Sequence, residues 1–212
     1  MPIVDLTIPL VHGIASYPGE PGGAFIQFAS IEGQGFLSHQ LLLYSHGGTH
    51  VDAPSHFLPQ GSDVMAMRLD SLIGPAIVAD VPTHSAEIQL SDIRWPREPE
   101  AGDRILLRTG WGSHWGQPDY FSGSPNLSIA VAQYLSDKGI ALLGMDMPTP
   151  NAVEPQAIHE ILLGHDIIII EGLINMEKIV GSKGVLICLP LAGVGLDGAP
   201  ARVVFTDKAA GQ

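Results

Sequence analysis

Hydrophobic and polar positions follow different periods in the two halves of the chain. The first half has short apolar runs separated by turns rich in glycine and proline, which predicts strands and loops. The second half alternates apolar strand-like runs with amphipathic helical segments. This order is typical of an α/β domain with mixed sheets and few helices. No repeat, linker or low-complexity tract interrupts it, so we expect a single domain over residues 1–212.

Apolar runs bounded by turn residues predict the strands. Leu41 to Tyr44 is apolar at every position, as expected for an interior strand, and Asp166 to Ile170 carries four consecutive isoleucines, which favours burial on both faces. Residues 11–23 read as a loop or as an arm folded over the rest, and 191–200 as a glycine-rich loop. The predicted strands are 3–9, 24–31, 37–45, 77–81, 104–109, 140–143, 166–170, 185–189 and 201–206.

Two segments predict helices. Ser128 can cap a helix that runs to Lys138, with apolar residues at helical spacing and Gly139 after it. Pro155 suits the first position of a second helix, which ends near Leu163. Residues 65–72 suit one or two helical turns.

Composition and charge narrow the class of partner. Hydrophobic residues make up 45% of the chain and charged residues 15%, as in a compact globular protein. The net charge of −12 argues against nucleic acid and against anionic membrane surfaces. No leader precedes Asp5, and no apolar run is long enough to span a bilayer. The single cysteine, Cys188, lies in an apolar run and excludes an internal disulfide. We expect a cytoplasmic protein with a small-molecule substrate.

Residues 46–56 contain three of the nine histidines and one aspartate. His46, His50 and Asp52 are separated by even numbers of residues, so an extended backbone places them on one side. Two glycines and a proline disfavour a helix here, which leaves a strand that ends in a glycine-kinked loop. Imidazole and carboxylate donors in one small volume suit Zn²⁺ or Mn²⁺. Since burying four polar side chains without partners is costly, packing alone explains the array poorly.

Further candidate residues follow predicted strands. Glu171 ends the isoleucine strand and needs a charged or metal partner there. His159, on the preceding helix, could meet it where helix and strand pack. Asp146 also ends a strand, as a functional carboxylate or as a turn residue bonded to its own backbone. Trp111 follows another strand and is either a pocket wall or a core residue. His39 is read as a structural or surface histidine.

The run from His46 to Phe57, H-G-G-T-H-V-D-A-P-S-H-F, resembles the signature of the cyclase-like metal-dependent hydrolases. This family contains bacterial kynurenine formamidase and isatin hydrolase. The likeness extends over nearly the whole chain. It departs from the family pattern at 146–151 and at Glu20, near the substrate end. The other matching segments are Tyr17 to Glu20, Leu72 to Pro75, Arg108 to Trp111, His159 to Leu163 and Ile170 to Gly172.

The resemblance implies a swivelling β/β/α domain, assembled as a homodimer or homotetramer, with the N-terminal strand and arm, residues 1–23, near the active site. It also implies one or two divalent metals, Zn²⁺ or Mn²⁺, with Asp52 bridging them and His56 as the catalytic histidine. The metal ligands that it implies are His46, His50, Asp52, His159 and Glu171.

These ligands predict hydrolysis. A divalent metal lowers the pKa of bound water towards neutrality and polarises a carbonyl group. His56, outside the ligand set, could move the proton between water and the leaving group. The chain has no G-x-S-x-G elbow, and Cys188 lacks the setting of a reactive thiol, so covalent catalysis is not expected.

The leading substrate is an aryl formamide of the N-formylkynurenine type, followed by a cyclic amide such as isatin or a lactone. Tyr17 and Trp111 would suit an aromatic acyl group, and Asp146 is a further candidate for substrate contact. A metal-dependent binding protein without turnover is a different possibility, against which the non-ligand His56 counts. A structural zinc site is disfavoured because such sites prefer cysteine.

Overall fold

The computed structural model describes residues 3–82 and 85–207. Its core is an eight-stranded sheet with both parallel and antiparallel pairs, joined by few helices, so the expected mixed α/β architecture is confirmed. The strands and helices are β1 (Ile3–Asp5), β2 (Ala24–Ala29), α1 (Ile31–Gln34), β3 (Ser38–Leu42), β4 (His50–Asp52), α2 (Leu69–Leu72), β5 (Ile73–Asp80), β6 (Glu87–Ile88), β7 (Arg104–Arg108), β8 (Asn126–Leu127), α3 (Ile129–Lys138), β9 (Leu142–Met145), α4 (Pro155–Leu163), β10 (Ile168–Glu171), β11 (Lys183–Pro190) and β12 (Gly198–Thr206).

The strand order is β1-β12-β11-β5-β7-β9-β10-β4, and a further pairing of β12 with β4 closes the sheet on itself. Strand β4 therefore lies between β10 and β12. His50 is opposite Glu171 of β10, and Asp52 is opposite Gly198 of β12. Because alternate residues share a face and paired residues are close neighbours, this register gathers His50, Asp52 and Glu171.

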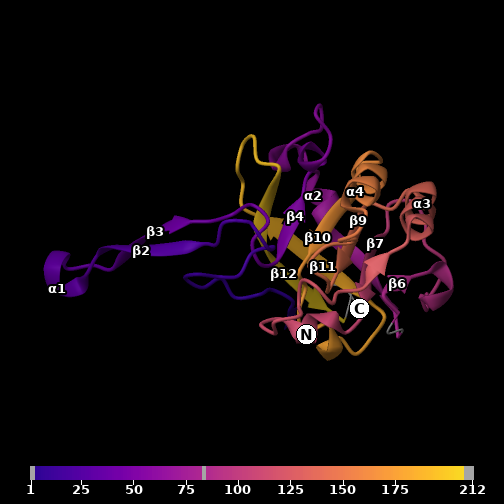
Figure 1. Cartoon of the computed structure of the whole chain (residues 1–212), viewed down its shortest axis with the longest axis horizontal. Coiled ribbons are helices and arrows are strands. Elements are labelled where there is room, and N and C mark those ends of the chain that lie inside the picture. The colour runs from indigo at the N-terminus through magenta and orange to yellow at the C-terminus, as the bar shows by residue number, and fades with distance from the viewer. Residues whose placement is uncertain (1–2, 83–84, 208–212) are drawn as a thin grey trace.

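Two apolar clusters hold the closed sheet together. One lies within the sheet and includes Leu6, Val51 and Phe205. The other fills the space between the sheet and helices α3 and α4, which lie together on one side of the molecule (Figure 1). Ile169 of β10 belongs to this second cluster. The site-bearing strands are thus buried on both faces, as the isoleucine run predicts.

The two predicted helices are confirmed. The Ser128 side chain accepts a hydrogen bond from the backbone N–H of Val131, and Gly139 ends α3 with a left-handed φ of 66°. Helix α4 starts at Pro155 and runs to Leu163. It packs against β10, which follows it in the chain and carries Glu171.

The expectation of an interior strand at Leu41 to Tyr44 is wrong. Strands β2 and β3 pair only with each other and form, with α1, a hairpin that projects from the sheet (Figure 1). Leu41 is 55% exposed. An all-apolar run shows that a strand is suited to burial, but it does not show that this chain alone buries it. From here on we reserve the name arm for residues 24–42, which are distinct from the N-terminal segment, residues 1–23.

Other boundaries also differ from the predicted ones, among them that of β1, which ends at Asp5 instead of Pro9. The glycine-kinked loop precedes β4 instead of following it, so His46 lies in the loop. Strand β5 starts at Ile73 and β12 at Gly198, because strand pairing carries both past residues that read as turns. The two-residue strands β6 and β8 were not predicted. Within the described parts of the chain, no helix has the length and apolar character needed to cross a membrane.

Candidate metal centre

The loop before β4 is fixed by one buried threonine. The Thr49 hydroxyl donates to the carbonyl of Gly172 at 2.6 Å and accepts from the backbone N–H of Ile8 at 2.8 Å. These bonds tie the loop to the end of β10 and to the segment after β1. The loop that carries His46 and leads into His50 of β4 is thereby held in place.

Four buried side chains surround one small space at the start of β4. They are those of His50, Asp52, His159 and Glu171, and we call them together the ring. The Nε2 atom of His50 lies 3.4 Å from Asp52 Oδ1 and 3.3 Å from Glu171 Oε2. The Nε2 atom of His159 lies 3.6 Å from Asp52 Oδ2 and 3.4 Å from Glu171 Oε1. The structure thus brings His159 and Glu171 together across the helix–strand packing. All four distances exceed those of normal hydrogen bonds.

The ring fits a divalent cation. His50 Nε2, Asp52 Oδ2 and Glu171 Oε1 are buried atoms without a hydrogen-bond partner among the described residues. The Nδ1–H of His50 donates to the carbonyl of Gly48 at 3.0 Å, and that of His159 donates to the carbonyl of Pro155 at 2.6 Å. Since a carbonyl can only accept, each Nε2 is left to face the carboxylates. Anchoring the outer ring nitrogen in this way is typical of metal-binding histidines.

Asp52 connects two groups of potential ligands. His50, Asp52 and Glu171 present ligand atoms within 4.8 Å of one another, and so do His46, Asp52 and His56. The sharing fits a bridging role for Asp52. It also makes His56 a geometrically possible ligand, so its separation from the ligand set stays a prediction.

The ring strongly perturbs its own proton affinities. Burial alone would lower the pKa of His159, but the neighbouring carboxylates of Asp52 and Glu171 outweigh this effect and raise the pKa to about 10. The pKa of His50 is raised well above its usual value against the same penalty of burial. The pKa of Asp52 is held well below its usual value, because its three histidine neighbours outweigh burial. Without a cation, protons therefore neutralise the ring, and a cation would displace them.

A second, less buried set of side chains lies beside the ring. His46 stands between two carboxylates, with Nδ1 2.8 Å from Asp52 Oδ1 and Nε2 2.9 Å from Asp197 Oδ2. The His56 ring stacks on that of His46 with centroids 3.9 Å apart. Burial lowers the pKa of His56, so its imidazole is neutral at pH 7.

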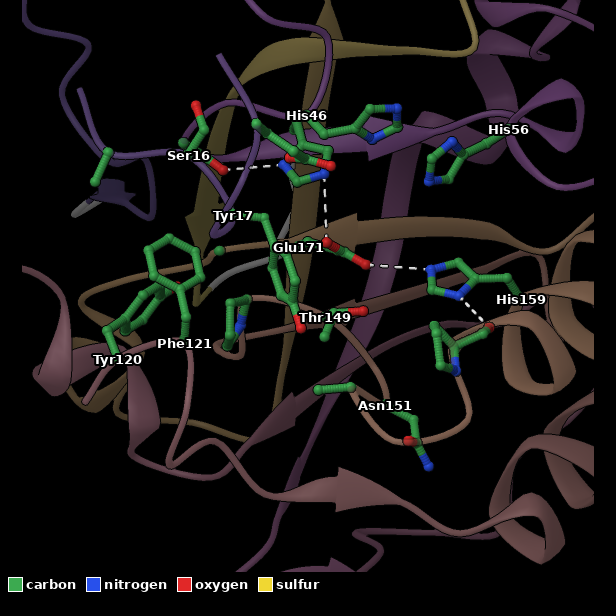
Figure 2. A pocket seen from close by; sticks show the side chains of 18 of the residues that line it. Ser16, Tyr17, His46, His56, Tyr120, Phe121, Thr149, Asn151, His159 and Glu171 are labelled. Carbon is green, nitrogen blue, oxygen red and sulfur yellow. Dashed lines mark hydrogen bonds and ion pairs between the residues drawn. The ribbon is translucent and has the colours of Figure 1, made fainter. Parts of the chain in front are cut away.

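These groups lie at one end of a pocket whose other end is aromatic. Figure 2 shows His56 and His159 on one side and Tyr17, Tyr120 and Phe121 on the other. Phe121 makes edge-to-face contacts with both tyrosines, at centroid distances of 5.7 Å and 5.0 Å. The N-terminal segment contributes Ala15, Ser16, Tyr17 and Glu20 to the lining.

Two residues predicted for substrate contact, Trp111 and Asp146, are not among those that line this pocket. The Asp146 carboxylate is buried and accepts hydrogen bonds from the backbone of Thr109 and Gly110, which fix the turn after β7. The Trp111 indole donates to the carbonyl of Tyr120 at 2.9 Å and packs on the core. Trp111 therefore contacts a pocket-lining residue, Tyr120, without lining the pocket itself. Tyr17 alone of the three predicted contacts lies in the lining.

Sequence reasoning missed several residues near the ring. Trp115, Tyr120 and Phe121 lie in an irregular segment without strand or helix periodicity. Asp197 precedes a glycine, and the pair reads as a turn signal inside a predicted loop. The pairing of β12 with β4 is what brings Asp197 to His46, and only the tertiary structure shows it.

Known proteins resemble the chain over nearly its full length. Kynurenine formamidase of Bacillus mycoides (strain KBAB4) is 32% identical over 207 residues, which cover 95% of this chain and 96% of the relative. A Bacillus stearothermophilus structure described as a "predicted metal-dependent hydrolase" has a TM-score of 0.82, 26% identity and 98% coverage of both chains. Isatin hydrolase A of Labrenzia aggregata, bound to benzyl benzoate, has a TM-score of 0.80 and 25% identity, over 96% of this chain and 93% of that one.

With the donor ring, these relatives place the protein in the class of metal-dependent hydrolases. A family model described as "Putative cyclase" matches residues 4–152. The chain belongs to this cyclase family, as its sequence signature predicts.

Proposed function

We propose that the protein hydrolyses the amide bond of a small aryl formamide. The observation that carries this proposal is the buried ring of His50, Asp52, His159 and Glu171, whose unpaired ligand atoms lie at the end of an aromatic pocket. The formamidase relative, which is 32% identical over 95% of this chain, supports the choice of substrate class.

We assign the ring, together with His46, to one or two Zn²⁺ or Mn²⁺ ions. Such ions lower the pKa of bound water and polarise the carbonyl that is attacked. The protein's own contribution is to fix the donors: Thr49 anchors the loop, and backbone carbonyls hold the rings of His50 and His159. These anchors reduce the reorganisation needed at the ligands.

His56 is assigned to proton transfer. Its side chain is 26% exposed and lines the pocket, and its lowered pKa keeps the ring able to accept a proton at pH 7. With Nδ1–H directed at Asp197, Nε2 would take the proton from water and return it to the departing amine.

The aromatic end of the pocket sets the proposed specificity. Tyr17, Tyr120 and Phe121 form a wall of edge-to-face rings on which a flat ring can pack. The cavity is about 200 Å³, below the roughly 300–1,000 Å³ of sites for drug-sized ligands. A small substrate with one aromatic ring fits this space.

A cyclic amide is the second candidate. The structural likeness to isatin hydrolase A supports it. The same metal-ligand side chains and the same aromatic wall would also accommodate a fused bicyclic substrate. The two candidates differ in whether the bond to be broken lies in a chain or within a ring. The sequence-based expectation of a cytoplasmic location stays a prediction.

Turnover of matched substrates tests the proposal. Metal-free protein and protein loaded with Zn²⁺ or Mn²⁺ are assayed with N-formylkynurenine, isatin and a simple lactone, and metal content is measured by elemental analysis. We expect metal-dependent kcat/KM to be at least tenfold higher for the formamide, on the order of the discrimination that pocket contacts supply. Preference for isatin would replace the formamide with the cyclic amide. A metal-loaded protein inert towards all three would indicate a binding protein.

We also propose that a second copy of this chain covers the arm. Residues 24–42 carry a single formal charge, Glu32, although the whole chain has a net charge of −12. At the base of the arm lies an apolar groove of about 490 Å³, lined in part by Ile8, Leu41 and Leu189. One chain thus offers an apolar arm and an apolar groove, as a two-fold interface requires. The exposed apolar residues of the arm are Ile26, Phe28, Ile31, Phe36, Leu37, Leu41 and Leu42.

Solution mass tests this assembly. By light scattering we expect a mass of at least two 22.4 kDa chains, and a lower mass for Phe28→Lys because it places a charge in the interface. Val180→Lys is the control, since Val180 is equally apolar and exposed but lies outside the arm. A wild-type protein that stays monomeric at micromolar concentration would contradict the proposal.

A further inference from the structure

Asp197 contacts His46 of the candidate centre, which lies 151 residues earlier in the chain. It directly precedes β12, and its backbone carbonyl accepts a hydrogen bond of 2.8 Å from the N–H of Ala53. The next residue, Gly198, pairs with Asp52 across β4 and β12. A Cβ atom on Gly198 would lie 2.6 Å from Cε1 of His46. The chain therefore passes directly beside the His46 ring, and glycine is needed for this approach.

The three candidate ligand histidines differ in what holds their second ring nitrogen. For His50 and His159 that partner is a backbone carbonyl. For His46 it is the Asp197 carboxylate, whose Oδ2 lies 2.9 Å from Nε2. Because a carboxylate only accepts, Nε2–H donates to Asp197, and without a metal Nδ1–H donates to Asp52 in the same way. A cation beside Asp52 would take the place of the Nδ1 proton, so Nδ1 is the nitrogen left to bind it. A carboxylate in this position fixes the ring and makes the opposite nitrogen a stronger donor to metal.

The same oxygen also contacts the proposed proton carrier. Oδ2 of Asp197 lies 3.4 Å from Nδ1 of His56. The rings of His46 and His56 stack with an interplanar angle of 26°, so the orientation of one limits that of the other. One carboxylate oxygen thus contacts both rings of a stacked pair.

We propose that Asp197 is a positioning residue that orients His46 towards the metal and His56 towards the pocket through a single carboxylate oxygen. This inference rests on the proposed function, because it takes His46 as a ligand and His56 as the proton carrier. It adds a fourth chain segment, the start of β12, to the segments that carry the centre. Its geometric basis is the pair of contacts at 2.9 Å and 3.4 Å.

Metal affinity and turnover of Asp197 variants test the proposal in the full-length protein. Asp197→Asn keeps the shape and one acceptor oxygen but removes the charge, and Asp197→Ala removes both. We expect Zn²⁺ affinity, measured by competition with a chelator, to fall about 10–100-fold in Asp197→Ala and by less in Asp197→Asn. At saturating Zn²⁺, kcat should fall while KM changes less than about threefold, because neither variant touches the aromatic wall. In Co²⁺-loaded protein the visible absorption bands should shift.

The control is Asp70→Asn, which removes a charge from an exposed carboxylate paired with Arg68. Zn²⁺ affinity and kcat within twofold of wild type in both Asp197 variants would overturn the proposal. A loss of stability with unchanged affinity would do the same, since that is the result expected of a purely structural residue. A fall in affinity with unchanged kcat at saturating Zn²⁺ would overturn the assignment to His56. The affinity and absorption measurements need no substrate, so an error in the proposed substrate class leaves them intact.

Discussion

The candidate centre has two halves that are built differently. The inner half consists of His50, His159 and Glu171, which lie on β4, α4 and β10 and are buried. Backbone carbonyls of Gly48 and Pro155 anchor both imidazoles. Reorienting either imidazole would break its hydrogen bond to the main chain. The inner half is therefore suited to holding a cation in a fixed place.

The outer half consists of His46, His56 and Asp197, which lie in a loop, in a short 3₁₀ turn and before β12. Its rings are held by each other and by a carboxylate that is 44% exposed. Side-chain anchors of this kind can adjust as protons move. Asp52 contacts both halves. We propose that the inner half fixes the cation, and that the outer half adds the ligand His46 and moves protons through His56.

Replacing Asp52, which contacts both halves, should have the largest effect on metal content and turnover. Asp52→Asn replaces the carboxylate that lies within 3.6 Å of three imidazoles, so two buried histidines lose the charge that balances them. We expect less than about a tenth of the wild-type metal content and a fall in kcat/KM of roughly 10³-fold or more, by elemental analysis and steady-state kinetics. Full metal occupancy in the variant would show that the two halves do not depend on Asp52.

Replacing His56 should lower turnover without loss of metal, and so distinguish the two halves. His56→Ala leaves the inner half untouched, so we expect full metal content with kcat lowered by about 10²–10⁴-fold, the usual contribution of general acid–base catalysis. His39→Ala, on the exposed strand β3, is the matched control. Loss of metal in His56→Ala would make His56 a ligand, as its grouping with His46 and Asp52 allows.

More of the arrangement of the inner half than of the outer half could be predicted from the sequence. Even spacing placed His50 and Asp52 on one face, and the isoleucine run placed Glu171 at the end of a buried strand. These are local signals that periodicity carries. The meeting of His159 with Glu171 needed the resemblance to a family as well, because spacing alone does not fix how a helix packs on a strand.

Within the outer half, the place of Asp197 depends on long-range pairing that leaves little trace in the sequence. Asp197 reaches His46 only because β12 pairs with β4 and closes the sheet. The same limit explains the arm, where Leu41 has the pattern of an interior strand and is exposed in the single chain. Local pattern predicts how a segment can be buried. It does not predict which partner buries it.

A methyl group at Gly198 should disturb the outer half selectively. The added Cβ would lie 2.6 Å from His46 Cε1 and 2.8 Å from the carbonyl oxygen of Val51, so the ring or the strand must shift. We expect Gly198→Ala to lower kcat/KM about tenfold and the stability by about 1–3 kcal/mol. Gly181→Ala is the control, because its Cβ would meet nothing nearer than 3.7 Å. Wild-type kinetics in Gly198→Ala would show that the position of the His46 ring matters little.

The smallest effect is expected from pH, and it concerns the inner half without metal. The pKa of His159, lowered by burial but raised more by Asp52 and Glu171, is about 10, against 6.5 for the free group. A raised pKa stabilises the folded state fully below about 6.5, and the stabilisation is lost as the pH rises towards about 10. We therefore expect the urea midpoint of chelator-treated protein to fall between pH 7 and pH 10, on the order of 0.5 M.

The metal-loaded protein should lose less over the same range, because a cation in the ring replaces the proton that His159 would otherwise release. Groups outside the ring titrate equally in both forms, so the difference between the two midpoints isolates the inner half. Equal pH slopes with and without Zn²⁺ would mean that the ring does not exchange protons for metal. The assignment of the cation to the inner half would then lose its physical basis.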